Sequence, residues 1–324
     1  MSGKLRMRHN PFDVLGEYLV IVAIALLVVV TIFVEPKFLS PGNMTNIMRQ
    51  FGPLIMVALG MTFVIIGGFI DLSVAGIMSL VAVVTLSLIE PLGQVPALLI
   101  GLLLGAACGY LNSILILLSG AITQAEGLFI TYGMSVLYGG VALVYTGGVT
   151  DHMSYISRDY SLFTAIGTGT VGIFSVSFLI FLVALAALYV FHEKTYLGRT
   201  INLTGGNKTA ARLSGISINK SITIIYTISG LMTALGAIVL FARVTTASPV
   251  LGKNFETNAI LSVVVGGTSL SGGNGNVIRT VLGTMLVILL ANCMNLLGVS
   301  VFMQNVMKGA ILILAIWLDN RKEH

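Results

Sequence analysis

Hydrophobic residues along this chain fall into long runs that are separated by short polar segments. A membrane-spanning helix needs about 20 consecutive apolar residues, and runs near that length recur throughout the sequence. The pattern predicts ten helices, at residues 15–34, 49–69, 72–90, 95–118, 126–145, 170–191, 221–241, 257–270, 276–297 and 301–318. The run 257–270 is short and contains glycine, so a half-span or a broken helix is expected there.

The composition indicates the same class. Hydrophobic residues make up 56% of the 324 positions and charged residues only 9%, which is more apolar surface than a soluble domain can bury. We therefore predict an all-α membrane protein with one transmembrane domain over residues 15–318, between tails 1–14 and 319–324. Cys108 and Cys293 lie in apolar runs without metal-ligand spacing, so neither a disulfide nor a metal or cofactor site is predicted.

The basic residues predict the orientation in the membrane. Ten spans place both chain ends on one side. With the N-terminus inside, eleven Lys and Arg residues fall in cytoplasmic segments and five in outer segments, while Lys308 lies within a span. This bias follows the positive-inside rule, so both termini are predicted to be cytoplasmic. The charges are spread over loops rather than along one stripe, which argues against a nucleic-acid partner.

The longest cytoplasmic segment, residues 192–220, is unusually polar and basic for this chain. Within it, "GGNKTAARLSG" predicts one short helix: Asn207 suits an N-cap, and Gly215 suits the left-handed residue that ends a helix. Gly205 and Gly206 would let the chain turn sharply before it. Two turns of helix are marginal alone in water. The segment is therefore either a loop whose charges enforce topology and meet lipid headgroups, or a knob that docks on a soluble partner.

Four segments of the chain, from about Phe38 to the C-terminus, resemble one protein family in the same order. They are "LGR…GGNKTAARLSGI", "GMTFVIIGGFIDLSV", "AILSVVVGGTSLSGGNG" and "NCMNLLGVS". The sequence is thereby similar to the permease subunits of sugar-importing ABC transporters of the ribose type. No G-x-x-x-x-G-K-[ST] motif occurs in the sequence, so the chain itself is not expected to bind ATP.

The resemblance implies a fold, a mechanism and partners. The fold would be that of an ABC importer permease, in which the short helix couples to a cleft of an ATP-binding cassette subunit. The other implied partners are an extracytoplasmic sugar-binding protein, a second permease copy as homodimer or heterodimer, and the lipid of a bacterial inner membrane. The residues implied in coupling to the ATPase are Gly198, Arg199, Gly205, Gly206, Asn207, Ala210, Ala211, Arg212, Leu213 and Gly215.

Polar residues inside the apolar runs are candidates for gating or for a weak sugar pathway. Asp71 and Ser73 precede a predicted helix, where their oxygens either cap its free N–H groups or take part in gating. The glycines of "GGTSLSGGNG" either form a re-entrant turn or contact sugar. Amides inside spans bond either to a neighbouring helix or to sugar hydroxyls. The candidate set is Asp71, Ser73, Asn112, Gly266, Gly267, Ser269, Ser271, Asn292 and Asn295.

Three function classes fit a protein of this composition. An intramembrane enzyme would need paired acids or a nucleophile and base near one membrane face, and the four histidines, assigned to loops or tails, pair with neither. A stand-alone secondary transporter would need ionisable residues within its spans, where only Asp71 and Lys308 come near. The capped helix in the cytoplasmic loop favours the third class, the permease of an ABC importer of a monosaccharide.

Overall fold

The computed structural model describes residue 22 and residues 25–322, and these residues are mostly helical. Within them, seven helices are long and apolar enough to cross a membrane: α2 (Pro41–Ile66), α3 (Val74–Leu92), α4 (Gln94–Leu118), α5 (Gln124–Thr146), α7 (Val176–Lys194), α10 (Ile218–Val244) and α12 (Val277–Leu296). Three shorter apolar helices occupy other predicted spans: Ala25–Val34, α11 (Phe255–Val265) and α13 (Val301–Lys322). The all-α, multi-pass class is confirmed, and the count of ten spans stays a prediction. The predicted tail 1–14 and residues 15–21 of the first span lie outside the described residues.

Polar side chains fix where several helices begin. The Ser40 hydroxyl accepts from the Asn43 backbone N–H, with Pro41 in the first helical position of α2. Thr123 and Glu126 form a reciprocal capping box at the start of α5. Each oxygen satisfies an N–H group that has no partner inside the helix, which a membrane protein cannot leave bare.

The helices α2 and α10 form the centre of the bundle. Within α2, 89% of the most apolar window is buried, compared with 28% for α5. The small residues of α4 let α10 approach closely: a methyl group at Gly109 would overlap the carbonyl oxygen of Tyr226, and one at Gly105 would overlap Ala234. The glycines of α4 therefore serve close helix packing within the subunit.

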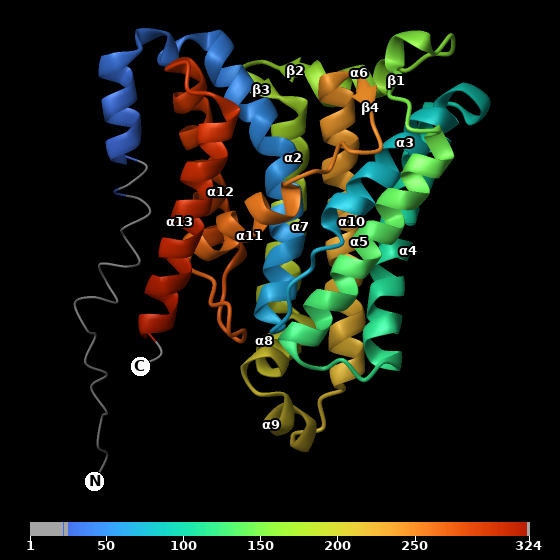
Figure 1. Cartoon of the computed structure of the whole chain (residues 1–324), viewed down its shortest axis with the longest axis vertical. Helices are drawn as coiled ribbons and strands as arrows, with labels where there is room; N and C mark the ends of the chain where they lie inside the picture. Colours follow the sequence, from blue (N-terminus) through green and yellow to red (C-terminus); the bar gives the residue numbers. More distant parts are fainter. Residues whose placement is uncertain (1–21, 23–24, 323–324) are drawn as a thin grey trace.

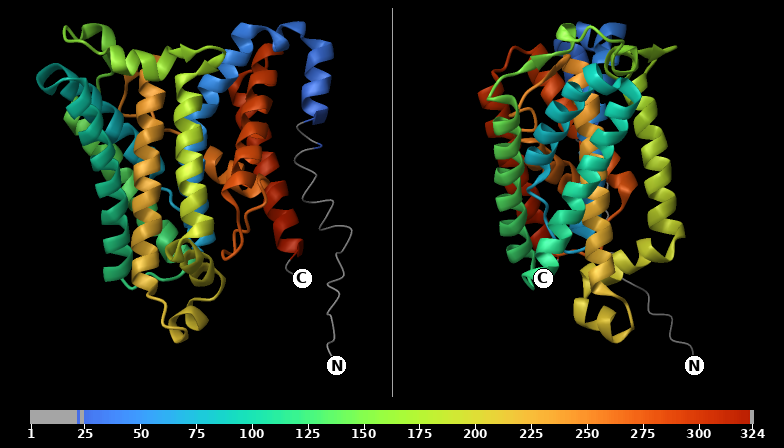
Figure 2. Two further views of the ribbon diagram at one scale, coloured as in Figure 1. Left: turned by 180° about the vertical axis from the view of Figure 1, so that it is seen from behind. Right: turned by 90° about the vertical axis from the view of Figure 1, so that its right-hand side faces the viewer.

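The two ends of the bundle differ (Figures 1 and 2). At one end, α8 (Tyr196–Gly206) and α9 (Lys208–Leu213) project beyond the long helices, and α13 ends on the same side. The opposite end carries the short elements η1 (Pro36–Leu39), β1 (Asp151–His152), η2 (Met153–Tyr155), α6 (Ser161–Thr168), β2 (Thr170–Val171), β3 (Phe174–Ser175) and β4 (Thr246–Ala247). Strand β1 pairs with β4, and β2 pairs with β3. The segment 192–220 and the end of α13 thus share one side.

Three predicted helix boundaries are wrong for local reasons. The span predicted at 49–69 begins at Pro41, because Ser40 caps the helix there and Pro41 occupies its first position. The span predicted at 170–191 begins only at Val176, because residues 170–175 form the β2–β3 hairpin around Gly172, whose φ is +60°. The helix predicted at 257–270 ends at Val265, and residues 266–276 form a loop before α12. That loop extends from the middle of the bundle toward the end with α8 (Figure 1). The run forms a short helix of 11 residues, and the choice between a half-span and a broken helix stays a prediction.

Candidate functional site

The short helix predicted in the polar segment is present as α9. The Asn207 side chain accepts from the Ala210 backbone N–H at 2.9 Å. At the other end, the Gly215 N–H donates to the Arg212 carbonyl and the Ile216 N–H to the Ala211 carbonyl, with Gly215 at φ +78°. This pair of bonds is the Schellman arrangement. Both predicted caps of α9 are confirmed, and its coupling role stays a prediction.

The faces of α9 differ in what they meet. Ala211 and Ile216 are buried against the rest of the chain, whereas Ala210, Arg212 and Leu213 are exposed. Leu213 is 84% exposed. Because α9 projects beyond the membrane-spanning helices, this apolar side chain does not lie among them. An exposed leucine on a well-capped helix is suited to docking in an apolar groove of another protein.

A second helix in this segment, α8, was missed by the sequence analysis. Thr195 caps it by accepting from the Gly198 N–H at 3.1 Å, and Arg199 is exposed on it. His192, assigned to a loop, instead lies buried in the last turn of α7 and bonds through Nε2 to the Asn202 side chain at 2.8 Å. The last residues of α7, from His192 to Lys194, are polar, and the polarity of residues 192–202 obscured the end of α7 and the start of α8.

Gly205 and Gly206 do not form the sharp turn that was expected, because they are the last residues of α8. Their smallness serves a close approach of backbones. A methyl group at Gly205 would overlap the Ile66 carbonyl oxygen and lie 2.8 Å from the Gly273 nitrogen. On the other side, a methyl group at Gly272 would lie 2.8 Å from the Cα of Gly68. We call these contacts the glycine junction: Gly68, Gly205, Gly206, Gly272 and Gly273.

Three of the predicted pathway residues come together in one buried network. The Asp71 carboxylate accepts from the Ser73 backbone N–H at 3.0 Å and from the hydroxyls of Ser73 and Ser229 at 2.5 and 2.8 Å. The Asn112 amide donates to the Ser73 hydroxyl at 2.7 Å and accepts from the Tyr138 hydroxyl at 3.1 Å. The network joins the segment 67–73 to α4, α5 and α10. Ser229 and Tyr138 were not among the predicted residues, because serine and tyrosine are common residue types in helices and carry no local signal.

This arrangement alters the two interpretations of Asp71. Ser73 is the N-cap residue of α3, but its side chain makes no capping bond to that helix. The carboxylate is fully buried and bonds across to α10 through Ser229. Ordinary helix capping therefore does not account for this pair of residues, and a gating role for Asp71 stays a prediction.

The helices α2 and α11 end in the same way. After α2, the Gly68 N–H donates to the Ile65 carbonyl and the Phe69 N–H to the Val64 carbonyl. After α11, the Gly267 N–H donates to the Val264 carbonyl and the Thr268 N–H to the Val263 carbonyl. Gly68 and Gly267 have φ values of +78° and +88°, which only glycine adopts readily. Gly267 thus turns the chain after α11, whereas Gly266 has helical backbone angles, and the choice between a re-entrant turn and a sugar contact stays a prediction.

The loop after α11 makes one internal bond and bonds to two other helices, α13 and α5. The Ser271 N–H donates to the Ser269 hydroxyl at 3.3 Å, which shapes the turn internally. The Leu270 N–H donates to the Asp319 carboxylate of α13, and the Leu270 carbonyl accepts from the Gln124 side chain of α5 at 2.9 Å. A direct contact of Ser269 or Ser271 with sugar stays a prediction.

The two asparagines of α12 make bonds to neighbouring helices. Asn292 and Asn43 of α2 exchange two amide hydrogen bonds, at 3.0 and 2.8 Å. The Asn295 oxygen accepts from the Gln304 amide of α13 at 2.7 Å. Asn43 lies in the first turn of α2 and Asp71 follows its last turn, so these asparagines and the Asp71 network are at different levels of the bundle. Within the described subunit the candidates do not form one continuous path.

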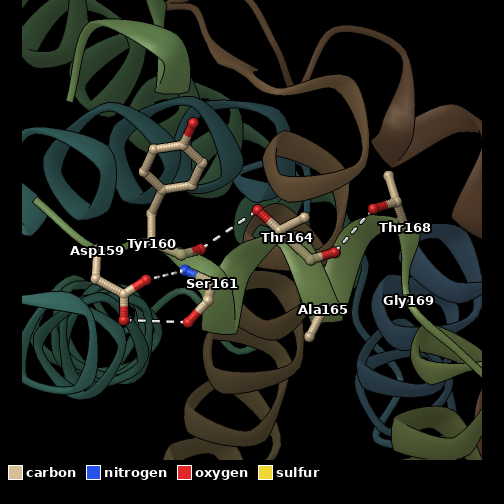
Figure 3. A pocket seen from close by; sticks show the side chains of 7 residues that line it. All are labelled: Asp159, Tyr160, Ser161, Thr164, Ala165, Thr168 and Gly169. Atoms are coloured by element: carbon tan, nitrogen blue, oxygen red, sulfur yellow. Dashed lines mark hydrogen bonds between the residues drawn. The ribbon is translucent and has the colours of Figure 1, made fainter. Parts of the chain in front are cut away.

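A separate hollow lies at the opposite end from α9. It has a volume of about 520 Å³ and is lined by residues of α6 and of the segments on either side of that helix, between Asp159 and Gly169 (Figure 3). The Asp159 carboxylate accepts from the backbone N–H and the hydroxyl of Ser161, and these bonds lower the pKa of Asp159. None of the predicted coupling or pathway residues lines this hollow.

Comparison with known proteins identifies the family. A family model described as "Branched-chain amino acid transport system / permease component" matches residues 43–316. The chain is 35% identical over 305 residues to the ribose import permease protein of Escherichia coli (strain K12), covering 94% of this chain and 93% of the relative. It is 36% identical over 309 residues to the ribose import permease protein of Bacillus subtilis (strain 168), covering 95% and 93%.

A galactose/methyl galactoside import permease protein of Escherichia coli (strain K12) is also similar, at 32% identity over 319 residues, covering 93% of each chain. No solved structure matches the chain. The family match spans every element from the first turn of α2 into α13, including the glycine junction and the Asp71 network. The chain therefore belongs to the family of transport-system permease components that this model describes.

Proposed function

We propose that this chain is the transmembrane permease subunit of an ATP-binding cassette importer that moves a monosaccharide, ribose or a related pentose or hexose, into the cytoplasm. The names of the similar proteins support a sugar as substrate. The chemistry that drives transport belongs to a separate ATPase subunit. Transport would take place in the bacterial inner membrane with α9 and both termini on the cytoplasmic side.

The observation that carries this proposal is the construction around α9. The helix is capped at both ends, presents Leu213 outward, and follows α8, whose last residues touch the end of α2 and the loop after α11 in the glycine junction. A displacement of α9 by a docked subunit would thereby reach α2 and the loop after α11 through backbone contacts. Packed backbones transmit such shifts because they are not continuously deformable.

The other partners follow from the same proposal. An extracytoplasmic sugar-binding protein would deliver the substrate at the end that carries α6, and a second permease copy would complete the pathway. The helices α5 and α7 support this second point, because only 28% and 22% of their most apolar windows are buried within one subunit. The buried network of Asp71, Ser73 and Asn112 belongs to the gating machinery in this proposal.

Reconstitution tests the proposal. Proteoliposomes that contain the permease, its ATPase subunit and the binding protein should accumulate labelled ribose only when ATP is present on the side of the membrane that carries the ATPase subunit. Permease alone should accumulate none against a gradient. Accumulation by the permease alone, driven by an ion gradient, would instead support a stand-alone secondary transporter.

A variant of α9 makes the test specific. Leu213→Asp should abolish uptake and the co-purification of the ATPase subunit, while its thermal unfolding in detergent stays that of the wild type because Leu213 is exposed. The matched control is Leu39→Asp at the opposite end of the bundle, where Leu39 is also exposed. Normal uptake by Leu213→Asp would refute docking through α9.

A further inference from the structure

The first residue of α9, Lys208, turns its side chain back toward the membrane-spanning bundle. Its Nζ donates to the carbonyl oxygen of Ile122 at 2.5 Å and lies 4.0 Å from the ring centroid of Phe69. The side chain is half-buried. Neither contact belongs to the capping of α9, which uses Asn207. The sequence analysis does not assign Lys208 to the coupling residues.

The two partners of Lys208 belong to different segments of the chain. Ile122 lies in the turn between α4 and α5, next to Thr123, which caps α5. Phe69 lies in the break after α2, two residues before Asp71, and its ring packs edge-on against Tyr226 at 6.0 Å. A methyl group at Gly127 of α5 would lie 2.8 Å from the Phe69 ring. The ammonium group of Lys208 thus contacts both the turn that precedes α5 and the segment that leads to Asp71.

The chemistry of the site suits a charged lysine. A carbonyl oxygen and the face of an aromatic ring both attract a cation. Glu126 in the first turn of α5 adds a favourable charge: burial lowers the pKa of Lys208, and the Glu126 carboxylate acts against that shift. A neutral side chain of the same length would keep the packing on Phe69 and lose the bond to Ile122.

The inner part of α5 also bonds to two other segments. Its first residue, Gln124, donates to the Leu270 carbonyl in the loop after α11, and the Thr131 hydroxyl donates to the Ile70 carbonyl and accepts from the Leu72 N–H of the segment after α2. We propose that Lys208 is a positioning residue that fastens α9 to the inner end of α5 and to the Phe69–Asp71 segment, so that a movement of α9 moves both. This inference rests on the proposed function, because that function supplies the force on α9.

A coupling measurement tests the role in transport. In the reconstituted complex, Lys208→Met should still bind the ATPase subunit and hydrolyse ATP, but should use about five-fold or more ATP per sugar imported than the wild type. Lys208→Arg keeps the positive charge and should recover most of the coupling. Lys220→Met is the matched control, since Lys220 is an exposed lysine in the same segment. A ratio of ATP to sugar in Lys208→Met equal to that of the wild type would overturn the inference.

A distance measurement tests the same contact without transport or ATPase. Spin labels at the exposed positions Thr209 of α9 and Ala125 of α5, in a chain whose buried Cys108 and Cys293 are replaced by Ala, report the separation of the two helices. The distribution of distances between the two labels should be narrow in the wild type and in Lys208→Arg, and clearly broader in Lys208→Met. Equal widths would overturn the inference whatever the uptake assay gives. If the wild-type complex imports no sugar with ATP, the proposed function fails, while the label distances still decide whether Lys208 fastens the two helices.

Discussion

The backbone N–H of Gly273 donates a hydrogen bond to the carbonyl oxygen of Ile66 at 2.7 Å. Ile66 is the last residue of α2, and its carbonyl has no partner within that helix. The bond therefore joins the end of α2 to the loop after α11. Gly205 of α8 lies directly against the same carbonyl, so that three separate parts of the chain meet at one hydrogen bond.

Gly205→Ala should damage this meeting point severely. The new methyl group would overlap the Ile66 carbonyl oxygen, where only backbone can give way. Overpacking of this kind costs about 1–3 kcal/mol. Here it also pushes α8 away from the end of α2 and from the loop after α11. We expect a lower thermal unfolding temperature in detergent and loss of sugar uptake.

Gly206→Ala is the matched control for Gly205→Ala. A methyl group at Gly206 would lie 3.7 Å from the Cα of Gly273, which is an ordinary contact. Both changes add one methyl group at the C-terminal end of α8, so propensity affects them similarly. Equal uptake by the two variants would contradict the role assigned to the glycine junction.

Asp71→Ala should destabilise the protein as well as impair transport. The substitution leaves the Ser73 N–H and the Ser73 and Ser229 hydroxyls without their acceptor in a fully buried place. Each buried group left unsatisfied costs about 1–3 kcal/mol. Thermal unfolding can be followed with a thiol-reactive dye, because Cys108 and Cys293 are both buried and free.

The exposed Asp151 provides the comparison for Asp71. Asp151→Ala should unfold at the temperature of the wild type. A wild-type unfolding temperature for Asp71→Ala would show that the network does not hold the segment 67–73 in place.

The sequence predicts what depends on local chemistry. The caps at Asn207 and Gly215 and the long apolar helices all follow from neighbouring residues, and the structure confirms them. The role of Gly205 could not be read in this way, because the atom that excludes a side chain there belongs to Ile66, far away in the chain. A glycine in a polar segment looks like a turn until its neighbours in space are known.

The Asp71 network illustrates the same limit for polar residues. Asp71, Ser73 and Asn112 were chosen because polar residues inside apolar runs are costly. Ser229 and Tyr138 are equally part of the network but are common residue types in helices, so no local signal marks them. The amides of Asn292 and Asn295 bond to two different helices, α2 and α13, and no local pattern identifies these partners.

The sidedness of the chain can be tested by labelling single cysteines in intact cells. A cysteine in place of the exposed Leu213 of α9 should be protected from a membrane-impermeant maleimide. A cysteine in place of the exposed Tyr155 at the opposite end should react. The physical reason is the excess of Lys and Arg expected on the cytoplasmic side. Labelling of Leu213→Cys in intact cells, with Tyr155→Cys protected, would invert the proposed orientation.

The amide pair of Asn43 and Asn292 should contribute a measurable interaction between α2 and α12. The two side chains exchange two hydrogen bonds, and Asn43 also donates to the Phe38 carbonyl. Because Asn43→Ala loses that third bond too, only a double-mutant cycle isolates the pair. We expect each single Ala variant to be destabilised and the double variant to be less destabilised than the sum, with an interaction free energy of roughly 0.5–2 kcal/mol.

Asn43 and Asn112 provide the control cycle, since Asn112 bonds to Ser73 and Tyr138 and shares no partner with Asn43. Those two substitutions should add within about 0.5 kcal/mol. If the cycle of Asn43 and Asn292 is equally additive, the pair does not tie α2 to α12. Their amides would then be free to exchange partners. That result would favour the alternative role of these amides, which is to bind sugar hydroxyls in a transport pathway.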